Sequence, residues 1–282
     1  MGGTDDIAVP SRTLLTGAEL PAVGFGTYDI PPEATTEAVR TALDAGYRHI
    51  DCAEGYGNEA AVGTALAEYD REELFVTSKV VPSNLHYETL LSACEESLDR
   101  LGTSYLDLYL IHWPNPAISL RETLDAMATL YDSGRIRHVG VSNFSRYQLK
   151  FARRISEVPI TVLQTELHPW FQQRELLSYC ETHGIVPVAA APLGRTRVFE
   201  DETVRAVAEK YDATPSDVVL RWHLERDVVP IPRSTTESHI RSNVDLFEWS
   251  LDSEDLARID EIGRREKLYT IEPDHDTYGI SE

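Results

Sequence analysis

Four side chains that can exchange protons stand at the ends of short apolar segments. Asp51 follows "YRHI", and Tyr56 comes five residues later. Lys79 stands near the end of "LFVTSKV", and His112 near the end of "LDLYLIHW". A free phenol, with a pKa near ~10, exchanges protons poorly near neutrality, but a neighbouring ammonium stabilises the phenolate. We expect Asp51 to hold Lys79 in place and Lys79 to polarise Tyr56. Tyr56 would then protonate a carbonyl oxygen that His112 orients by hydrogen bonding.

The sequence contains no second constellation of this kind. It has no serine or cysteine beside a suitable base, no HExxH motif and no carboxylate-rich cluster, so we expect no metal. A proton-donating tyrosine without a nucleophile or a metal leaves the carbonyl carbon open to an external reagent. Hydride from a nicotinamide cofactor has the required chemistry.

The elements that must position these side chains alternate along the chain. Amphipathic stretches of helix length separate short β-rich segments, and several of them end in Gly after a charged turn. Eight β-rich segments span residues 22–28, 48–53, 74–80, 106–113, 137–143, 161–167, 185–192 and 228–234. Eight such βα units, without a Pro/Gly/Ser-rich linker, predict one closed (β/α)8 TIM barrel, which is an α/β fold. We expect a single domain over residues 1–282.

Two further segments bear on this fold. A doubly wound open sheet also alternates strands and helices, but a dinucleotide-binding sheet is expected to carry G-x-G-x-x-G after its first strand. Here "GFGTYDI" supplies only the first two of these glycines. Ahead of it, "SRTLLTGAEL" has a turn between two short apolar runs and predicts an N-terminal hairpin that caps the barrel floor.

A barrel gathers the carboxyl ends of its strands on one face, where active sites lie. Asp51, Lys79 and His112 come from three adjacent predicted strands, so they would meet Tyr56 on that rim. Along the chain the motifs run "GFGTYDI", "DAGYRHIDCAEGYGNE", "TSKV", "LDLYLIHWP", "GVSNF" and "PIPRS". With these motifs in this order, the sequence resembles the aldo-keto reductase family over nearly its whole length, and in particular its microbial, diketogluconate reductase-like members.

The resemblance implies that Asp51, Tyr56, Lys79 and His112 form the family's catalytic tetrad. It also implies that NAD(P)H lies extended across the barrel top, with its nicotinamide beside Tyr56 and without a Rossmann domain. The residues implied to contact the cofactor are Gly26, Thr27, Ser142, Asn143, Gln164, Leu193, Gly194, Arg233, Ser234, Thr235, His239 and Asn243. Tyr28, His112 and Trp113 are implied to border the substrate.

The chain departs from the family pattern where an aromatic ring usually stacks on the nicotinamide. Ala190, in "VAAAPLG", stands at that position. Either another ring, such as Trp170 or Phe171, covers this face, or the cofactor is held more loosely. Stacking of this kind contributes about 0.5 to 1.5 kcal/mol beyond area burial, so its loss would weaken binding without abolishing it.

A second departure concerns the 2′-phosphate of the cofactor. The family commonly uses a Lys, the next Ser and an Arg six positions after the Lys, whereas this chain has Arg233, Ser234 and His239. Arg233 is a good bidentate phosphate ligand, but His239 is charged only part of the time near neutrality. We expect NADP(H) to be preferred, with NAD(H) possible.

Two classes of function fit this sequence. The first is an NADP(H)-dependent reductase of aldehydes and ketones, and the second is a non-enzymatic nicotinamide-nucleotide-binding barrel that acts as a sensor or a structural subunit. The intact tetrad favours the enzyme, and a barrel isomerase or lyase would require a carboxylate base and a phosphate site that the sequence does not present. The loop "PNPAISL" is short. It indicates an open pocket for small-molecule carbonyl substrates.

Several other polar residues are given structural roles. Asn58 is expected to cap the helix that follows Tyr56. His168, His183 and His223 are expected to be surface or capping residues.

Composition narrows the range of partners. The chain has 47 Asp plus Glu against 26 Lys plus Arg, a formal net charge of −21, which disfavours nucleic acid and anionic membranes as direct partners. No stretch approaches the roughly 20 apolar residues of a membrane helix, and the acidic "MGGTDDIAVP" does not have a secretory pattern. The three cysteines form no CxxC pair, which is typical of reduced thiols. We expect a cytoplasmic protein, and the resemblance implies a monomer.

Abundant carboxylates combined with only four lysines, Lys79, Lys150, Lys210 and Lys267, suggest a halophilic source. Mutual repulsion of the acidic groups falls as the Debye length shortens from about 10 Å at 0.1 M salt to about 3 Å at 1 M. We therefore predict that the thermal unfolding temperature rises with KCl over this range. An optimum of stability and activity in low salt, with inactivation at high salt, would refute the hypothesis.

Overall fold

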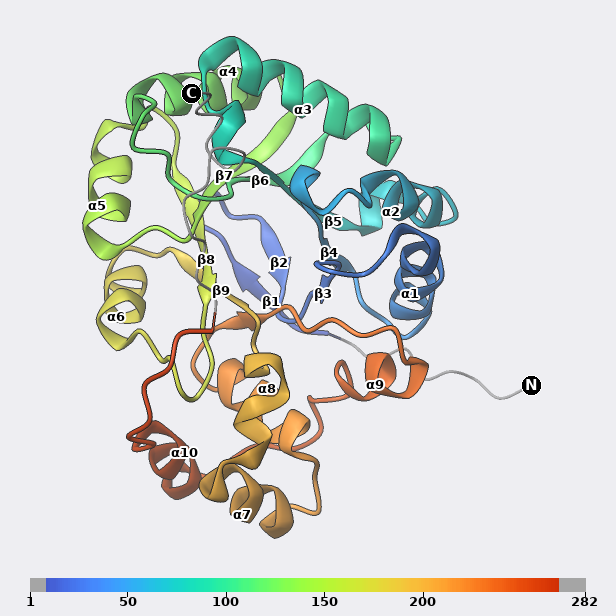
Figure 1. Ribbon diagram of the computed structural model, residues 1–282, viewed down its shortest axis with the longest axis vertical. Helices are drawn as coiled ribbons and strands as arrows, with labels where there is room; N and C mark the ends of the chain where they lie inside the picture. The colour runs from blue at the N-terminus through green and yellow to red at the C-terminus, as the bar shows by residue number, and fades with distance from the viewer. Residues whose placement is uncertain (1–8, 269–282) are drawn as a thin grey trace, which may run out of the picture.

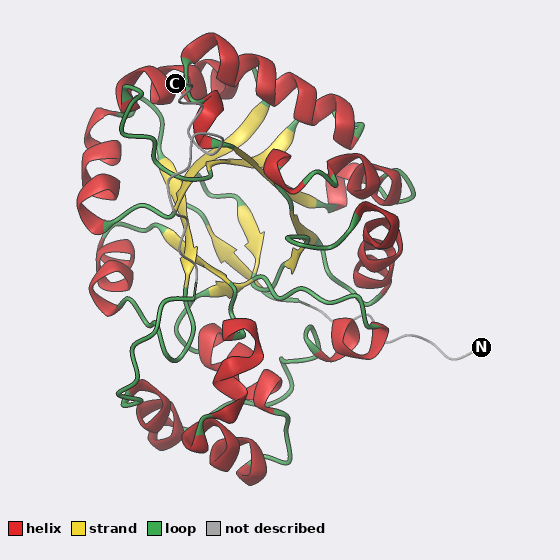
Figure 2. Ribbon diagram, viewed as in Figure 1, coloured by secondary structure: helices red, strands yellow, loops and turns green. Residues whose placement is uncertain are grey.

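Eight parallel strands form the centre of the fold, and helices surround them (Figures 1 and 2). The computed structural model describes residues 9–268, so the ends of the predicted domain lie outside the described part. The strands are β3 (Phe25–Gly26), β4 (His49–Asp51), β5 (Phe75–Val80), β6 (Leu106–Ile111), β7 (Ile136–Ser142), β8 (Ile160–Glu166), β9 (Val186–Ala190) and β10 (Val229–Pro230). Each pairs with the strand that follows it in the chain. All eight overlap the predicted segments, which confirms the predicted strand order.

The first and last strands close the sheet into a barrel. The Gly24 N–H donates to the Pro230 carbonyl and the Gly26 N–H to the Pro232 carbonyl. The donor–acceptor distance is 3.0 Å in both bonds. A Cβ atom at Gly26 would lie only 2.8 Å from the Ile231 carbonyl oxygen, so the two strand ends can approach this closely only because residue 26 is glycine. The (β/α)8 barrel is thus confirmed.

The predicted hairpin is also present. Strands β1 (Ser11–Thr13) and β2 (Glu19–Pro21) pair antiparallel around a turn at Gly17, whose φ is +83°. Leu14 and Leu20 of this hairpin are buried and pack in one apolar cluster with strand side chains such as Phe75 and Val229. These two begin β5 and β10, so the hairpin covers the amino-terminal end of the barrel.

Helices form the outer layer of the fold. They are α1 (Pro32–Asp44), α2 (Glu59–Leu66), α3 (Tyr87–Leu101), α4 (Leu120–Asp132), α5 (Arg146–Ile155), α6 (Arg174–Thr182), α7 (Glu202–Lys210), α8 (Pro215–Leu224), α9 (Glu237–Ser242) and α10 (Ser253–Asp260). Two of them begin with a capping box, formed by Ser145 with Gln148 at α5 and by Thr214 with Asp217 at α8. Short 3-10 turns lie at Glu54–Tyr56, Arg71–Glu73, Pro82–Asn84 and Gly194–Glu200.

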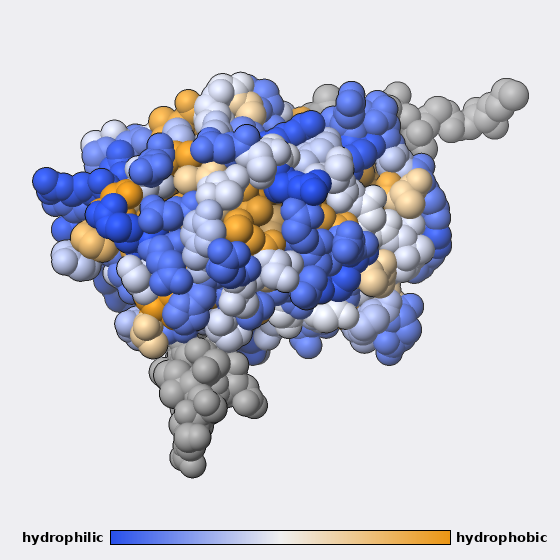
Figure 3. Space-filling model, turned by 90° about the horizontal axis from the view of Figure 1, so that it is seen from above, coloured by the Kyte–Doolittle hydropathy of each residue, from blue (hydrophilic) through white to orange (hydrophobic). Residues whose placement is uncertain are grey.

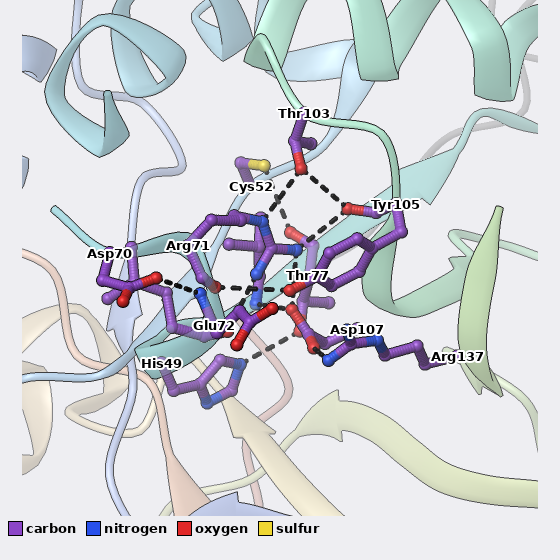
Figure 4. A network of polar contacts seen from close by, with 12 residues as sticks. His49, Cys52, Asp70, Arg71, Glu72, Thr77, Thr103, Tyr105, Asp107 and Arg137 are labelled. Atoms are coloured by element: carbon purple, nitrogen blue, oxygen red, sulfur yellow. Dashed lines mark hydrogen bonds and ion pairs between the residues drawn. The ribbon is translucent and has the colours of Figure 1, made fainter. Parts of the chain in front are cut away.

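A polar network ties neighbouring units together near the starts of β5 and β6 (Figure 4). The Asp107 carboxylate is buried and pairs with Arg71 at 2.7 Å and Arg137 at 3.3 Å, while it also accepts the Val76 N–H. Both guanidinium groups lie over the Tyr105 ring, at 4.0 and 3.7 Å from its centroid. A buried carboxylate with two cationic partners and a backbone donor is fully compensated, so this network fixes how the two strands sit together.

The predicted role of two histidines is wrong. His168 and His223 are fully buried, because the segment after β8, which carries His168, packs against α8, which carries His223. The His223 ring nitrogens lie 2.7 and 3.0 Å from the carbonyl oxygens of Val219 and Leu167. His183 does cap the carboxyl end of α6, as predicted.

The surface agrees with the acidic, polar composition. The face seen in Figure 3 is mostly hydrophilic, with apolar side chains in small groups. Within residues 9–268, no helix has the length and apolarity needed to span a bilayer. In the same range, no group of three or more His, Cys, Asp and Glu side chains is arranged to hold a metal ion.

Candidate active site

A cavity of about 740 Å³ opens at the carboxyl ends of the strands. This size is within the range of small-molecule sites, about 300 to 1,000 Å³. Its walls come from every barrel strand or from the loop that follows it: Gly26, Tyr28, Asp29, Asp51, Gly55, Tyr56, Val81, Pro82, Ser83, His112, Trp113, Ser142, Asn143, Gln164, Glu166, Ala190, Ala191, Pro192, Leu193, Arg195, Thr196, Ile231, Pro232, Arg233, Ser234 and Thr235.

Lys79 lies beneath the cavity floor and is completely buried. Its Nζ donates to Asp51 Oδ1 at 2.6 Å, to the Cys52 carbonyl at 2.8 Å and to the Tyr56 phenol oxygen at 3.1 Å. Burial by itself lowers the pKa of Lys79, but the negative charge of Asp51 and the adjacent Tyr56 oxygen raise this pKa above its ordinary value on balance. The ammonium is therefore permanent at any physiological pH.

Asp51 is held from several sides. Its second carboxylate oxygen accepts a hydrogen bond from Gln164 Nε2 at 2.7 Å, and its backbone carbonyl accepts from the Thr27 N–H and hydroxyl at 3.0 and 3.1 Å. Asp51, which belongs to β4, thus links the segment after β3 with β5 and β8. Because Asp51 is anchored in this way, its carboxylate holds the ammonium of Lys79 in a fixed position.

Tyr56 ends a single 3-10 turn, Glu54–Tyr56, directly after β4. Gly57, with φ of +69°, reverses the chain at this point, and a Cβ atom at Gly55 would lie 2.9 Å from the Val81 side chain. The Tyr56 ring makes edge contacts with Tyr28 and His112, with centroids 5.1 and 5.5 Å apart. The phenol is therefore held between two aromatic neighbours and faces the cavity.

His112 follows β6 and contributes a neutral ring to the same cavity. Burial, with a smaller contribution from the positive charge of Lys79, lowers the pKa of His112 to about 3. Since a lowered imidazole pKa means that the proton is lost above that pH, the ring is neutral at physiological pH and offers one N–H donor. The His112 carbonyl accepts a hydrogen bond from Asn143 Nδ2 at 3.0 Å.

Asn58 does not cap the next helix with its side chain, contrary to prediction. It is buried, and Nδ2 donates to the carbonyls of Thr27 and Ile30 at 2.9 and 3.0 Å. Asn58 still occupies the N-cap position of α2, but its amide is turned toward these two carbonyls and its oxygen accepts no helix N–H. Asn58 therefore secures the segment between Thr27 and Ile30, which carries two residues of the cavity wall.

Most of the predicted cofactor and substrate residues line the cavity. Ser142, Asn143 and Gln164 lie together at the ends of β7 and β8, where Asn143 has φ of +61° and donates to the Ser142 hydroxyl at 3.0 Å. The other predicted residues in the wall are Gly26, Tyr28, Trp113, Leu193, Arg233, Ser234 and Thr235.

Four predicted residues lie outside this wall. Thr27 and Gly194 are buried behind it. His239 is exposed in α9, and Asn243, which follows α9, is buried and accepts a hydrogen bond from the Ser216 hydroxyl at 3.0 Å. A contact from these two residues would require a ligand that extends beyond the cavity.

Neither candidate replacement for a ring at Ala190 is part of the wall. Trp170 is buried elsewhere, where its indole N–H donates to Asp201 at 2.8 Å and the Arg264 guanidinium stacks on its ring at 3.6 Å. Phe171 also lies outside the lining. On this side the cavity is bordered by Ala190, the last residue of β9, and by Ala191 and Pro192 after it.

Sequence reasoning did not nominate several wall residues. Val81–Ser83 and Asp29 belong to loops whose course the sequence pattern does not predict. The sequence does indicate Glu166 as a polar residue at a strand end, without a role, because it lies two residues after Gln164 on β8 and so points to the same side of the strand. It is buried, with its carboxylate 3.0 Å from His168 Nε2.

Comparison with known proteins agrees with the fold. The family model of the aldo/keto reductases matches residues 22–264. An aldo-keto reductase of Mycobacterium sp. (strain JLS) is 39% identical, with 98% of this chain and 100% of that protein covered. A glyoxal reductase of Bacillus subtilis (strain 168) is 41% identical, with 90% and 93% covered.

Two solved structures are similar throughout. An aldo-keto reductase from a deep-sea metagenome library superimposes with a TM-score of 0.90 at 38% identity, covering 92% of this chain and 97% of that one. A Bombyx mori aldo-keto reductase in complex with NADP gives a TM-score of 0.88 at 32% identity, covering 96% and 98%. The chain therefore belongs to the aldo/keto reductase family.

Proposed function

We propose that this chain reduces aldehydes and ketones to alcohols with a nicotinamide cofactor, and that Tyr56 is the general acid. The observation that carries the proposal is the position of Lys79 Nζ, within hydrogen-bond distance of both Asp51 Oδ1 (2.6 Å) and the Tyr56 phenol oxygen (3.1 Å). A fixed ammonium next to a phenol stabilises the phenolate that remains after proton donation.

The roles of the other residues follow from this geometry. A bound reduced nicotinamide supplies the hydride that adds to the carbonyl carbon. Tyr56 gives its phenol proton to the carbonyl oxygen, which completes the alcohol, and the phenolate is reprotonated from solvent. The neutral His112 ring donates its N–H to the same oxygen and so orients it.

We infer that the nicotinamide cofactor lies extended along the cavity. It is continuous from Tyr56 to the segment Arg233–Thr235, so one ligand can reach both ends. The polar side chains of Ser142, Asn143 and Gln164 border the half next to Tyr56 and would hold the nicotinamide carboxamide. One similar protein of known structure is described as a complex with NADP.

Of the two cofactors, we propose that NADP(H) is preferred. Arg233 lies in the cavity wall with Ser234 beside it, and a guanidinium binds a phosphate in bidentate fashion. We propose small aldehydes, sugar-derived carbonyls or diketo acids as substrates, since the cavity is moderate in volume and one relative is named a glyoxal reductase.

We predict that Tyr56→Phe loses reductase activity by a factor of about 10² to 10⁴, the usual contribution of a general acid. The ring and its packing remain, so NADP⁺ binding should be unchanged. The measurement is NADPH oxidation with an aromatic aldehyde, together with calorimetric titration of NADP⁺.

Tyr147→Phe is the matched control, because Tyr147 lies on α5, is 78% exposed and contacts no part of the cavity wall. Its activity should equal that of the wild type. Retained activity in Tyr56→Phe would contradict the assigned role. A wild-type protein that binds NADPH but reduces no member of a broad carbonyl panel would indicate the non-enzymatic barrel instead.

A second prediction concerns the cofactor. Arg233→Ala should lower kcat/KM for NADPH by about 10- to 100-fold, the size of a charge-assisted hydrogen bond of about 1.5 to 3 kcal/mol. The value for NADH should change less than about 3-fold, since NADH has no 2′-phosphate. Arg154→Ala, at an exposed position of α5, is the control. Equal losses with both cofactors would show that Arg233 does not recognise the 2′-phosphate.

A further inference from the structure

Arg233 already has an anionic partner within the protein. Its Nη2 lies 2.9 Å from Asp29 Oδ2, and its Nη1 donates to the Asp29 backbone carbonyl at 3.4 Å. Both residues belong to the cavity wall. Asp29 follows β3 and Arg233 follows β10. These two strands close the barrel, so the ion pair joins the loops at the point of closure.

The position of Asp29 is fixed by buried anchors on either side. Asn58 holds the carbonyls of Thr27 and Ile30, and Thr27 is itself bound to the Asp51 carbonyl. Asp29 has φ of +58°, a left-handed conformation that aspartate tolerates better than most residues. Its side chain is 68% exposed, and yet the backbone that carries it is anchored. The backbone of Asp29 is therefore held at a position from which its carboxylate reaches Arg233.

A 2′-phosphate and the Asp29 carboxylate would require the same guanidinium. A phosphate monoester carries about −1.5 to −2 charges at pH 7, so it must displace Asp29 from Arg233 or lie close to a like charge. A ribose without this phosphate has two hydroxyl groups, which can donate hydrogen bonds to a carboxylate, as an acidic residue does in many NAD sites. Asp29 thus disfavours NADP(H) and is compatible with NAD(H).

We propose that Asp29 is a specificity-determining residue that lowers the preference for NADP(H) by competing with the 2′-phosphate for Arg233. The inference rests on the proposed function, because it needs a nucleotide in the cavity. It explains how one site can accept NAD(H) as well as NADP(H). Because the Asp29–Arg233 pair is exposed, salt screens it, and the discrimination due to Asp29 decreases as ionic strength rises.

The test is calorimetric titration of NADP⁺ and NAD⁺ against the wild type and Asp29→Asn at low salt. Asparagine keeps the shape of the side chain and tolerates the left-handed backbone. The variant should bind NADP⁺ roughly 5-fold more tightly, the effect of removing one exposed ion pair, with NAD⁺ affinity unchanged or weaker. At ~1 M KCl the difference in NADP⁺ affinity between the two proteins should fall below about 2-fold.

Asp227→Asn provides a closely matched control. Asp227 is likewise exposed, has φ of +55° and pairs with an arginine, Arg12, at 2.9 Å. That pair lies at the opposite end of the barrel, since Asp227 precedes β10 and Arg12 belongs to the hairpin. The control makes the same change in net charge and should leave the affinities for both nucleotides unaltered.

A double variant separates competition from simple repulsion. In the Arg233→Ala background, Asp29→Asn should change NADP⁺ affinity by less than about 2-fold, because the contested guanidinium is gone. A full effect in that background would overturn the proposed competition. Two results with Asp29→Asn alone would also overturn it. An equal gain in affinity for NADP⁺ and NAD⁺ would indicate that Asp29 faces a phosphate that both cofactors share, and an unchanged affinity for both would indicate that Asp29 does not act on the cofactor. A wild type that binds neither nucleotide would instead refute the proposed function.

Discussion

The buried ion pair between Lys79 and Asp51 is the interaction on which the candidate site depends. Each ion would cost several kcal/mol to bury without partners, so the fold must compensate both. The ammonium has three donors and three acceptors within 3.1 Å, and the carboxylate is shared between Lys79 and Gln164. Neither group can move without leaving the other as an uncompensated charge. The phenol of Tyr56, as the third acceptor, is therefore positioned by the charges beneath it.

Closure of the barrel determines what surrounds this pair. The hydrogen bonds from Gly24 and Gly26 to the last strand bring the loop after β3 next to the loop after β10. One loop carries Tyr28 and Asp29, and the other carries Arg233, so the rim of the cavity combines an aromatic side chain, a carboxylate and a guanidinium. The same closure that completes the fold thus sets which polar groups border the proposed cofactor site, and Asn58 anchors one of the two loops that carry them.

The strand order, the barrel and the hairpin could be predicted because the hydrophobic periodicity, the turn residues and the order of the motifs all indicate them. The clustering of Asp51, Tyr56, Lys79 and His112 also followed from their places at strand ends. Contacts between distant segments could not be predicted: the sequence pattern does not reveal that the Asn58 amide reaches the carbonyls of Thr27 and Ile30, or that the segment of His168 packs against the helix of His223. Five statements remain predictions: the roles of the tetrad, the single domain, the monomeric state, the cytoplasmic location and the halophilic source.

In the proposed mechanism Asp51 acts on Tyr56 through Lys79, and a double-mutant cycle on the reductase rate measures this coupling. Asp51→Asn, Lys79→Met and the double variant are compared in carbonyl reduction, after circular dichroism and thermal unfolding have shown that each is folded. We expect strong non-additivity: the rate of the double variant should be within about 3-fold of that of Lys79→Met, because Asp51 has nothing left to hold once the ammonium is removed. Losses that multiply would contradict it, since Asp51 and Lys79 would then contribute independently to the reaction.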